Sequence, residues 1–515
     1  MSRSRSQFVS VVGTAVLGAI LSLSPVAPAA ADPGDPGEPV VLDDDRWSDR
    51  GPSVSPDSEW VLSLPEREDG DEPQTLQSQP IRGGDVVQLS ADPFSGGGFS
   101  ITESILEYVV TDGGLVVQTS RTEEPRGPIR LTAVPVSGGL RAELDTGIGG
   151  TELLLSGDHS HVVYVGQEGV LRSIALPGGD PMDLGVTVIS GLQGSVLVPV
   201  GDDRVVVWGR ESGDADGRLW LVPVAGGPAT PLTAPAPAAR SPRSVTVAGD
   251  RVVFVADHRF AGVRELWSAR LSGTGAVRLS RDMPPGGDVK ELVVTPDGED
   301  VIFRADQRTN NVNELWRVSV DGGPTLRLSR KLVTGGDVKS GFAVADDGSV
   351  VVYRADARRN NQRELFGTDI DGSGHWRYNK RLPVGGDVNE AAVVGSTVVF
   401  RADQRVNNAK ELFAIPLRDG SLTVLSGPLA PRDDVQGRGT GRDFVVSPDG
   451  SVVAYATRGR NADGQALHLA PITGGAPVQL SDPALDSVRG PFWFSPDSAW
   501  VGWGSFDEAH RARAN

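Results

Sequence analysis

The sequence predicts an all-β protein, a β-propeller of four-stranded antiparallel blades, from three observations. Gly (65 residues) and Pro (37 residues) make up about a fifth of the 515-residue chain, which disfavours long helices and is typical of short strands joined by tight turns. One pattern recurs every 45 to 55 residues through most of the chain, and such a period indicates a repeat architecture. Each repeat contains four short apolar segments separated by turn residues, as a propeller blade requires.

The first element is an export signal, residues 1–31. Arg3 and Arg5 precede an apolar run from Phe8 to Leu23, and three Ala residues end at Ala31. The alternative is a membrane anchor, but the run is short for a spanning helix of roughly 20 residues, and small residues suit cleavage after Ala31. No later apolar run is long enough to span a membrane. We therefore expect a secreted protein, extracellular or in the cell envelope.

Composition excludes several classes of function. The net charge is −18 and the pI is about 4.8, which argues against a general nucleic-acid-binding protein and against docking on an anionic membrane. Cys is absent, so disulfides, zinc–thiolate sites and cysteine nucleophiles are excluded.

The segment from Val289 to Ser329 illustrates one repeat. The strand KELVV ends near the turn Pro296-Asp297-Gly298, in which Pro presets φ and Gly supplies a positive φ. The strand VIFRAD follows, and its Val, Ile and Phe residues suit a buried pleated surface. A polar loop leads to the strand ELWRVSV, and a Gly-Gly turn leads to the last strand, TLRLS.

The repeats amount to about ten blade motifs. Their first turns contain Asp57, Asp112, Gly157, Asp202, Gly249, Asp297, Asp347, Gly395, Asp449 and Asp497. Propellers typically have roughly four to eight blades, so two arrangements are open: a single ring over residues 32–515, or one propeller with another inserted within it. No Pro- or Ser-rich linker separates two sets of repeats, which favours the single ring.

The two ends of the chain resemble two parts of one repeat. Val40 to Leu42 resembles an outermost strand, whereas Phe492 to Trp503 resembles the two inner strands. We expect these segments to share a sheet, because the ring would then close and both sheet edges would disappear. The third strand of that blade has no clear candidate, since only the polar tail from Ser505 to Asn515 remains.

The Ser-Pro-Asp-Gly turn, the ELW or ELF strand and the Gly-Gly turn before Leu-Ser resemble the repeats of TolB-type, WD40-like β-propellers over residues 37–504. The resemblance implies an exported propeller that makes protein contacts in the cell envelope. TolB proteins also carry an N-terminal α/β domain, for which the segment between Asp32 and Gly51 has no room. The resemblance says little about function, because propellers host many unrelated activities.

Motifs for catalysis and metal binding are scarce. The sequence contains no G-x-S-x-G, no H-E-x-x-H and no P-loop. His159 and His161 share one turn but have no third ligand nearby in sequence, so a solvated turn is the simpler interpretation. Two acidic loops, Asp214–Gly217 and Glu68–Glu72, offer oxygen ligands for calcium, but neither matches a complete calcium-binding loop, and we interpret both as solvated.

A set of charged residues recurs at the ends of the second and third strands. Because a residue type that recurs in each blade serves the blade, we predict ion pairs and turn caps within or between blades, with a ligand groove as the alternative. The set comprises Asp257, Asp306, Asp356 and Asp403, then Glu265, Glu314, Glu364 and Glu411, and also Arg304, Arg354 and Arg401.

A second recurrent motif, Gly-Gly-Asp-Val, contributes Asp85, Asp288, Asp337 and Asp387, and residues 432–435 form a degenerate copy. We place it in the loop from the outermost strand of one blade to the innermost strand of the next. There the four carboxylates would form a partial acidic ring at the channel mouth that binds a divalent cation such as calcium or a cationic partner. The alternative is that each Asp caps its own turn.

Two functions remain open. The first is a non-enzymatic scaffold that binds a protein, peptide or glycan with one face. The second is an enzyme, of the lyase or glycoside hydrolase type, that uses carboxylates at the channel mouth. No single carboxylate pair stands out in the sequence, which favours the binding function and assigns no catalytic residue.

Overall fold

The computed structural model describes residues 40–43, 46–47, 53–66, 76–90, 103–122, 127–189, 196–237, 240–273, 275–418, 420–427, 429, 434–435, 444–458, 465–481, 488, 492–504 and 509–514. This part of the chain is all-β, with one 3-10 turn at Gln167–Gly169, so the predicted fold class is confirmed. None of its segments is a helix long and apolar enough to cross a bilayer. The predicted export signal, residues 1–31, lies outside the described residues.

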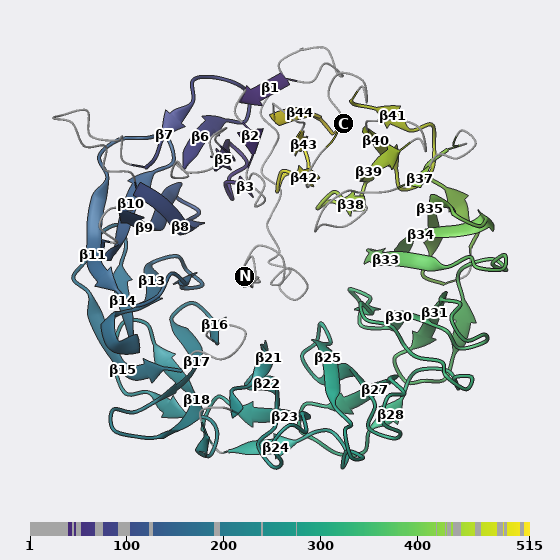
Figure 1. Cartoon of the computed structure of the whole chain (residues 1–515), viewed down its shortest axis with the longest axis horizontal. Coiled ribbons are helices and arrows are strands. Elements are labelled where there is room, and N and C mark those ends of the chain that lie inside the picture. The colour runs from purple at the N-terminus through teal and green to yellow at the C-terminus, as the bar shows by residue number, and fades with distance from the viewer. Residues whose placement is uncertain are drawn as a thin grey trace, which may run out of the picture.

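The strands form antiparallel sheets that follow one another in chain order, most of them four-stranded. Figure 1 shows them arranged radially around the centre of the molecule, with neighbours in sequence beside each other. This is the architecture of a β-propeller.

The sheets of the first half contain β3 (Ser53–Val54), β4 (Trp60–Ser63), β6 (Gln77–Pro80) and β7 (Val87–Gln88); β8 (Glu103–Val110), β9 (Leu115–Thr122), β10 (Ile129–Pro135) and β11 (Ala142–Ile148); β12 (Leu153–Leu155), β13 (His161–Val165), β14 (Val170–Ala175) and β15 (Met182–Val188); and β16 (Leu197–Val200), β17 (Arg204–Arg210), β18 (Asp216–Pro223) and β19 (Thr230–Pro231). β15 also pairs with β17, which joins two of these sheets, and β20 (Ala236–Pro237) pairs with β18. β2 (Arg46–Trp47) and β5 (Pro65–Glu66) form a separate ladder.

The sheets of the second half contain β21 (Arg243–Ala248), β22 (Arg251–Ala256), β23 (Glu265–Arg270) and β24 (Ala276–Arg278); β25 (Val289–Val294), β26 (Asp300–Ala305), β27 (Glu314–Ser319) and β28 (Leu326–Arg327); β29 (Ala343–Val344), β30 (Val350–Ala355), β31 (Glu364–Asp369) and β32 (His375–Arg377); β33 (Val388–Val394), β34 (Thr397–Val406), β35 (Ala409–Pro416) and β36 (Thr423–Val424); and β37 (Asp434–Val435), β38 (Phe444–Val446), β39 (Val452–Arg458), β40 (Gln465–Pro471) and β41 (Val478–Gln479).

Strands from both ends of the chain share the remaining sheet. It contains β42 (Phe492–Phe494), β43 (Trp500–Gly504), β44 (Ala509–Arg513) and β1 (Val40–Asp43), in the order β1-β44-β43-β42. The expectation that the polar tail offers no third strand is therefore wrong, because β44 lies in that tail. Its small residue Ala512 is buried beside Val501 and Trp503, so a strand forms there without a run of large apolar residues.

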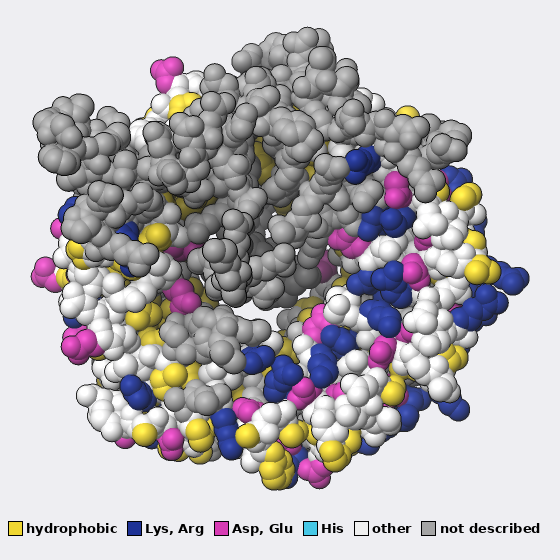
Figure 2. All heavy atoms as spheres, viewed as in Figure 1, with side chains coloured by type: hydrophobic (Ala, Val, Ile, Leu, Met, Phe, Trp, Pro, Cys, Tyr) yellow, Lys and Arg dark blue, Asp and Glu magenta, His cyan; other side chains and the backbone are white. Residues whose placement is uncertain are grey.

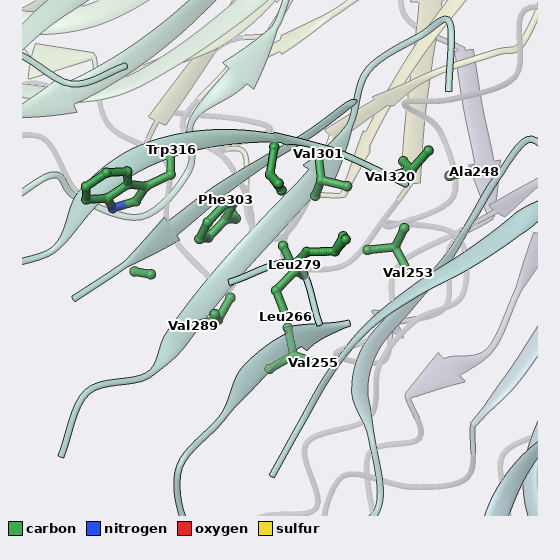
Figure 3. Packing of buried hydrophobic residues seen from close by; sticks show 12 residues of the cluster. Ala248, Val253, Val255, Leu266, Leu279, Val289, Val301, Phe303, Trp316 and Val320 are labelled. Atoms are coloured by element: carbon green, nitrogen blue, oxygen red, sulfur yellow. The ribbon is translucent and has the colours of Figure 1, made fainter. Parts of the chain in front are cut away.

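The second strand of a sheet is rich in apolar residues where both of its faces are buried, as in β22, whose six residues are all buried. In β22, Val253 and Val255 pack against the β25–β28 sheet, where they meet Val301. Phe254 points the opposite way, into a cluster with residues of the β16–β19 sheet. Figure 3 shows the first of these two clusters. A continuous apolar run is thus expected for a strand packed between two sheets.

Candidate functional site

Asp side chains connect neighbouring sheets in the second half of the chain. Asp288, Asp337 and Asp387 each precede the first strand of a sheet, and each accepts a hydrogen bond from a backbone amide of the preceding sheet. The donor–acceptor distances are 2.9 Å from the Arg264 amide to Asp288, 2.7 Å from the Asn313 amide to Asp337, 2.7 Å from the Arg363 amide to Asp387, and 2.6 Å from the Lys410 amide to Asp434. We call this contact the Asp clasp.

A second Asp completes the clasps of Asp288, Asp337 and Asp387. The backbone amide of Asp288 donates to Asp306 at the end of β26, over 2.6 Å. The other carboxylate oxygen of Asp306 accepts a 2.9 Å hydrogen bond from the amide of Asn311, which has a φ of 61°. Asp356 and Asp403 make the same two contacts in the next two sheets. These Asp residues therefore cap loops, as the repeat suggested.

The GGDV motif near the N-terminus is not equivalent to the others, so that part of the prediction is wrong. Asp85 lies between β6 and β7 of one sheet, at the turn between its third and fourth strands, and is exposed. The same four residues occur there because two Gly residues with positive φ, Gly83 and Gly84, also suit a hairpin turn.

Three of the clasps include an ion pair. Asp288 lies 2.7 Å from the Arg264 guanidinium and 3.1 Å from the Lys290 ammonium. Asp387 lies 2.6 Å from Arg363, and Asp434 lies 3.3 Å from Lys410. Burial raises the pKa of Asp288, but the hydrogen bonds from Arg264 and Lys290 outweigh it and hold this pKa below its ordinary value. The described residues include no group of three or more His, Asp and Glu suited to a metal ion. Calcium binding remains a prediction.

The Asp337 clasp departs from this pattern. Asn313 stands where the other clasps have Arg or Lys, and its side-chain amide donates to Asp337 over 3.2 Å. In the part of the chain that the structure describes, Asp337 has no Lys or Arg partner within ion-pair distance. The Asn313 side-chain oxygen is buried and accepts no hydrogen bond there. An acceptor and a carboxylate thus lie together without a cation.

Arg304 and Arg401 each stand opposite a Glu on the first strand of their sheet. Glu291 stands opposite Arg304 in the β25–β26 ladder, and the two side chains lie 3.2 Å apart. In the β33–β34 ladder, Glu390 stands opposite Arg401. The prediction of ion pairs within blades is therefore correct for Arg304, whose partner is Glu291.

Arg354 is a second departure, in the β29–β32 sheet. The position of the Glu is taken by Ser340, whose carbonyl accepts a 2.8 Å hydrogen bond from the Arg354 guanidinium. Arg354 also donates to the carbonyl of Asn389, but among the described residues it forms no ion pair. Its Nε is buried and has no acceptor. Burial and the nearby Arg363 lower the pKa of Arg354, while Glu390 and Glu291 partly offset them.

An extra residue accompanies this change. The segment from Val338 to the turn at Asp347 is one residue longer than its counterpart from Val289 to Asp297, and Gly341 has a φ of 78°. As a result β29 has two residues, whereas β25 has six. Bulges of this kind re-aim side chains and interrupt strand pairing.

The two departures meet in one cleft of about 600 Å³. Its walls come from three consecutive sheets, and it is lined by Arg304, Asn313, Asp337, Val338, Lys339, Ser340, Arg354, Asn361, Arg363 and Asp387. Three of these residues have carboxylate partners: Arg304 with Glu291, Arg363 with Asp387, and Lys339 with Asp356 at 3.3 Å. In the described part of the chain, Arg354 has no carboxylate partner and Asp337 has no cationic partner within ion-pair distance.

The cleft lies in the most basic part of an acidic protein. Residues 251–410 contain 24 Lys and Arg against 21 Asp and Glu, whereas the rest of the chain contains 25 against 46. In Figure 2, Lys and Arg side chains gather on the side of the molecule that Figure 1 labels from β25 to β37. A local excess of cations favours the approach of anions.

Among the residues that the structure describes, the other candidates from the sequence do not come together in a site. His159 accepts a 3.1 Å hydrogen bond from the amide of Asp112, and His161 contacts the Ser160 hydroxyl at 2.8 Å, so the two rings have different partners. Asp214 lies 3.6 Å from Arg218. The loop Glu68–Glu72 lies outside the described residues.

A signal for the cleft was present in the sequence. Aligned at their Val residues, the three segments VKEL, VKSG and VNEA differ in that only the middle one, which contains Ser340, lacks Glu. Likewise, Asn313 stands before a Glu-Leu strand where Arg264, Arg363 and Lys410 stand in the other repeats. The cleft is therefore marked by the two positions that depart from the repeat, Asn313 and Ser340, and not by the residues that recur.

No protein-family model and no curated protein matches this sequence. Among solved structures, Porphyromonas gingivalis dipeptidyl peptidase 4 is 12% identical, with a TM-score of 0.47, over 91% of this chain and 67% of that one. A prolyl endopeptidase, from a structural study of two such enzymes, is 13% identical, with a TM-score of 0.36, over 69% of this chain and 54% of that one. This chain thus spans about half the length of that endopeptidase.

An oligogalacturonate lyase in complex with manganese is 14% identical, with a TM-score of 0.33, over 71% of this chain and 99% of that one. At these identities and TM-scores, the activities, substrates and metal named for these proteins are not carried over to this chain.

Proposed function

We propose that this protein is an exported β-propeller that binds a ligand in the cleft between the β25–β28, β29–β32 and β33–β36 sheets, where Arg354 receives an anionic group of the ligand. The observation that carries the proposal is that Arg354 lines this cleft with a buried Nε that has no acceptor among the described residues.

The chemistry of Arg354 supports an anionic ligand. Its two recorded hydrogen bonds go to neutral carbonyls of Ser340 and Asn389, which neutralise none of its charge. A partly buried guanidinium without an anion carries a desolvation cost, and a carboxylate forms strong, directional hydrogen bonds with it. An anion in the cleft would therefore replace what Glu291 supplies to Arg304 in the preceding sheet.

Binding fits the cleft better than proton transfer does. Asp387 is held by the amide and the guanidinium of Arg363, and Asp337 accepts two hydrogen bonds from Asn313. An enzyme of the lyase or glycoside hydrolase type would need a carboxyl group poised to give or take a proton. The cleft thus favours a protein that binds a peptide, protein or glycan with an anionic group.

The proposal includes a single ring of ten blades, closed by β1, in a protein of the TolB type. The pairing of β1 with β44 and the unbroken order of the sheets along the chain support it. Secretion after cleavage near Ala31 completes it, because the apolar run and the Ala residues suit an export signal.

The experiment compares acetate with chloride at equal ionic strength, with melting temperature as the measurement. We expect acetate to raise the melting temperature of the wild type, and to have no such effect on Arg354→Gln. The matched control is Arg401→Gln, which changes the same strand position outside the cleft lining and should keep the acetate effect. An acetate effect that survives in Arg354→Gln would refute the assignment of this residue.

A further inference from the structure

We infer that the ligand of this cleft is a zwitterion, an amino acid or short peptide whose carboxylate binds Arg354 and whose ammonium group binds Asp337 and Asn313. The inference rests on the proposed function and adds the second charge of the ligand. Its basis is that the same cleft is lined by a carboxylate without a cationic partner, Asp337, and by a guanidinium without an anionic partner, Arg354, among the described residues.

The first departure leaves a place for a cation. In the clasps of Asp288, Asp387 and Asp434 an Arg or Lys side chain reaches the carboxylate. At Asp337 the corresponding residue is Asn313, which is neutral. The amide nitrogen of Asn313 donates to Asp337, so its oxygen points elsewhere, and this oxygen is buried with no donor in the described structure. A carboxylate and a free acceptor together match an ammonium group, which is a donor only.

The second departure leaves a place for an anion. Ser340 replaces the Glu that faces Arg304 and Arg401 in the flanking sheets. Arg354 consequently makes hydrogen bonds to two carbonyl groups and retains an unused Nε donor. A carboxylate matches this guanidinium in both charge and geometry.

The two sites require one ligand with both charges. The lining residues that are already paired, such as Arg363 with Asp387, leave Arg354 and Asp337 as the unpaired charges of opposite sign. A ligand that is only anionic would leave the Asn313 oxygen without a donor and Asp337 without a counter-charge, and a buried polar group without a partner is unfavourable. A cleft of about 600 Å³ lies within the range of small-molecule sites, roughly 300 to 1,000 Å³, so a short peptide fits.

The test uses unsubstituted peptides of increasing length, so that only the separation of the two charges varies. Glycine, diglycine, triglycine and tetraglycine are titrated against the full mature chain by calorimetry. For the length that binds most tightly, the N-acetylated and C-amidated forms are then measured. We expect each of these two modifications to weaken binding about tenfold or more, because each removes one charged hydrogen-bonding group of the ligand.

Variants that restore the repeat provide the second arm. Asn313→Arg supplies Asp337 with the cation found in the other clasps, and Ser340→Glu supplies Arg354 with the missing carboxylate. Each should weaken binding of the best peptide about tenfold or more while leaving the unfolding transition intact. The matched control is Arg264→Lys, which keeps a cation at a clasp outside the cleft and should bind as the wild type does.

The outcomes separate this inference from the proposed function. If the N-acetylated peptide binds as tightly as the free peptide while Arg354→Gln abolishes binding of both, the ammonium site is wrong and the proposed function stands. If no peptide binds and acetate has no effect that depends on Arg354, both are wrong. Should a variant fail to fold, the comparison of free, acetylated and amidated peptides on the wild type still decides the question.

Discussion

Asp288 illustrates how one side chain can fasten two sheets. Its carboxylate accepts hydrogen bonds from the amide and guanidinium of Arg264 in the β21–β24 sheet, while its own amide donates to Asp306 in the β25–β28 sheet. Charged hydrogen bonds of this kind are stronger than neutral ones. The clasp therefore contributes to the stability of the interface between the sheets.

Replacing Asp288 by Asn should lower the free energy of unfolding by about 1–2 kcal/mol at neutral pH, since the charge on its hydrogen bonds is lost. The folded-state pKa of Asp288 is below its unfolded value. Its contribution is therefore present above the unfolded pKa of about 3.8 and disappears as the pH falls through the folded pKa. Urea unfolding at several pH values measures the difference.

The control for this prediction is Asp85→Asn, a change in the exposed copy of the same motif. It should alter the free energy of unfolding by less than about 0.5 kcal/mol. Equal losses in the two variants would show that the clasp adds nothing.

His468 should make the protein sensitive to mild acid. Its ring stacks on Tyr455, with centroids 5.3 Å apart, and burial lowers its pKa from 6.5 to about 4. The unfolded chain takes up the proton near pH 6.5 and the folded chain only near pH 4, so stability falls between these values and then levels off. The full loss is about 3 kcal/mol.

The variant His468→Phe removes this proton uptake. The difference in unfolding free energy between wild type and variant should therefore change by up to about 3 kcal/mol between pH 7 and pH 4, as urea titrations would measure. A difference that is constant over this range would contradict the account of His468.

At the scale of elements, the first strand of the β29–β32 sheet differs most from its equivalents. The extra residue near Gly341 shortens the ladder and exposes the carbonyl of Ser340 to Arg354. The Gly341 amide donates to Glu291 of the preceding sheet at 3.0 Å, which holds the irregular segment in place. The cleft thus depends on a local backbone conformation as well as on side chains.

Gly341→Ala should destabilise the protein by about 1 kcal/mol, because an L-residue with a side chain is strained at a φ of 78°. Space is not the cause, since a Cβ at this position would meet the Arg354 guanidinium at an ordinary 3.5 Å. Gly341→Asn should lower the free energy of unfolding by less than Gly341→Ala does, because Asn tolerates a positive φ better. Chemical denaturation of the wild type and both variants measures these free energies of unfolding. An Ala variant as stable as the wild type would contradict the prediction.

Elements with local signals could be predicted from the sequence, and so could the sheet that both chain ends share, because each end resembles part of one repeat. Side-chain contacts between strands could not be predicted. The turn at Asp297 was predictable because Thr295, Asp297 and Gly298 form it among themselves. By contrast, the partner of Arg304 lies across the sheet, so it follows only from the strand register. The sequence places Asp85 in a loop between blades, whereas it lies in a hairpin turn between β6 and β7, because one motif suits both kinds of turn.

The candidate cleft was missed for the same reason. Asn313 and Ser340 are unremarkable residues in isolation, and their meaning depends on which side chains they face in neighbouring sheets. Only the three-dimensional register shows that one replaces a cation and the other an anion.

At the scale of the molecule, β1 should stabilise the whole propeller. It comes from the N-terminal end of the chain and pairs with β44, with Val40 opposite Arg511 and Val41 opposite His510. A sheet edge left open by its removal would expose unpaired backbone groups of β44. β1 should therefore stabilise the sheet in which strands from both ends of the chain pair.

Deleting residues 32–47 should lower the melting temperature by several degrees relative to the mature chain that begins at residue 32. Calorimetry of the two proteins measures the shift. An unchanged melting temperature would show that pairing of the chain ends does not support the fold.

The central claim is that two exceptions in an otherwise regular repeat make the ligand site. The double variant Asn313→Arg/Ser340→Glu tests it most directly, with peptide affinity measured by calorimetry on a protein whose unfolding is checked in parallel. The account predicts a protein at least as stable as the wild type that no longer binds the peptide, because both charges of the cleft are then satisfied internally. Binding as tight as that of the wild type in the folded double variant would contradict it.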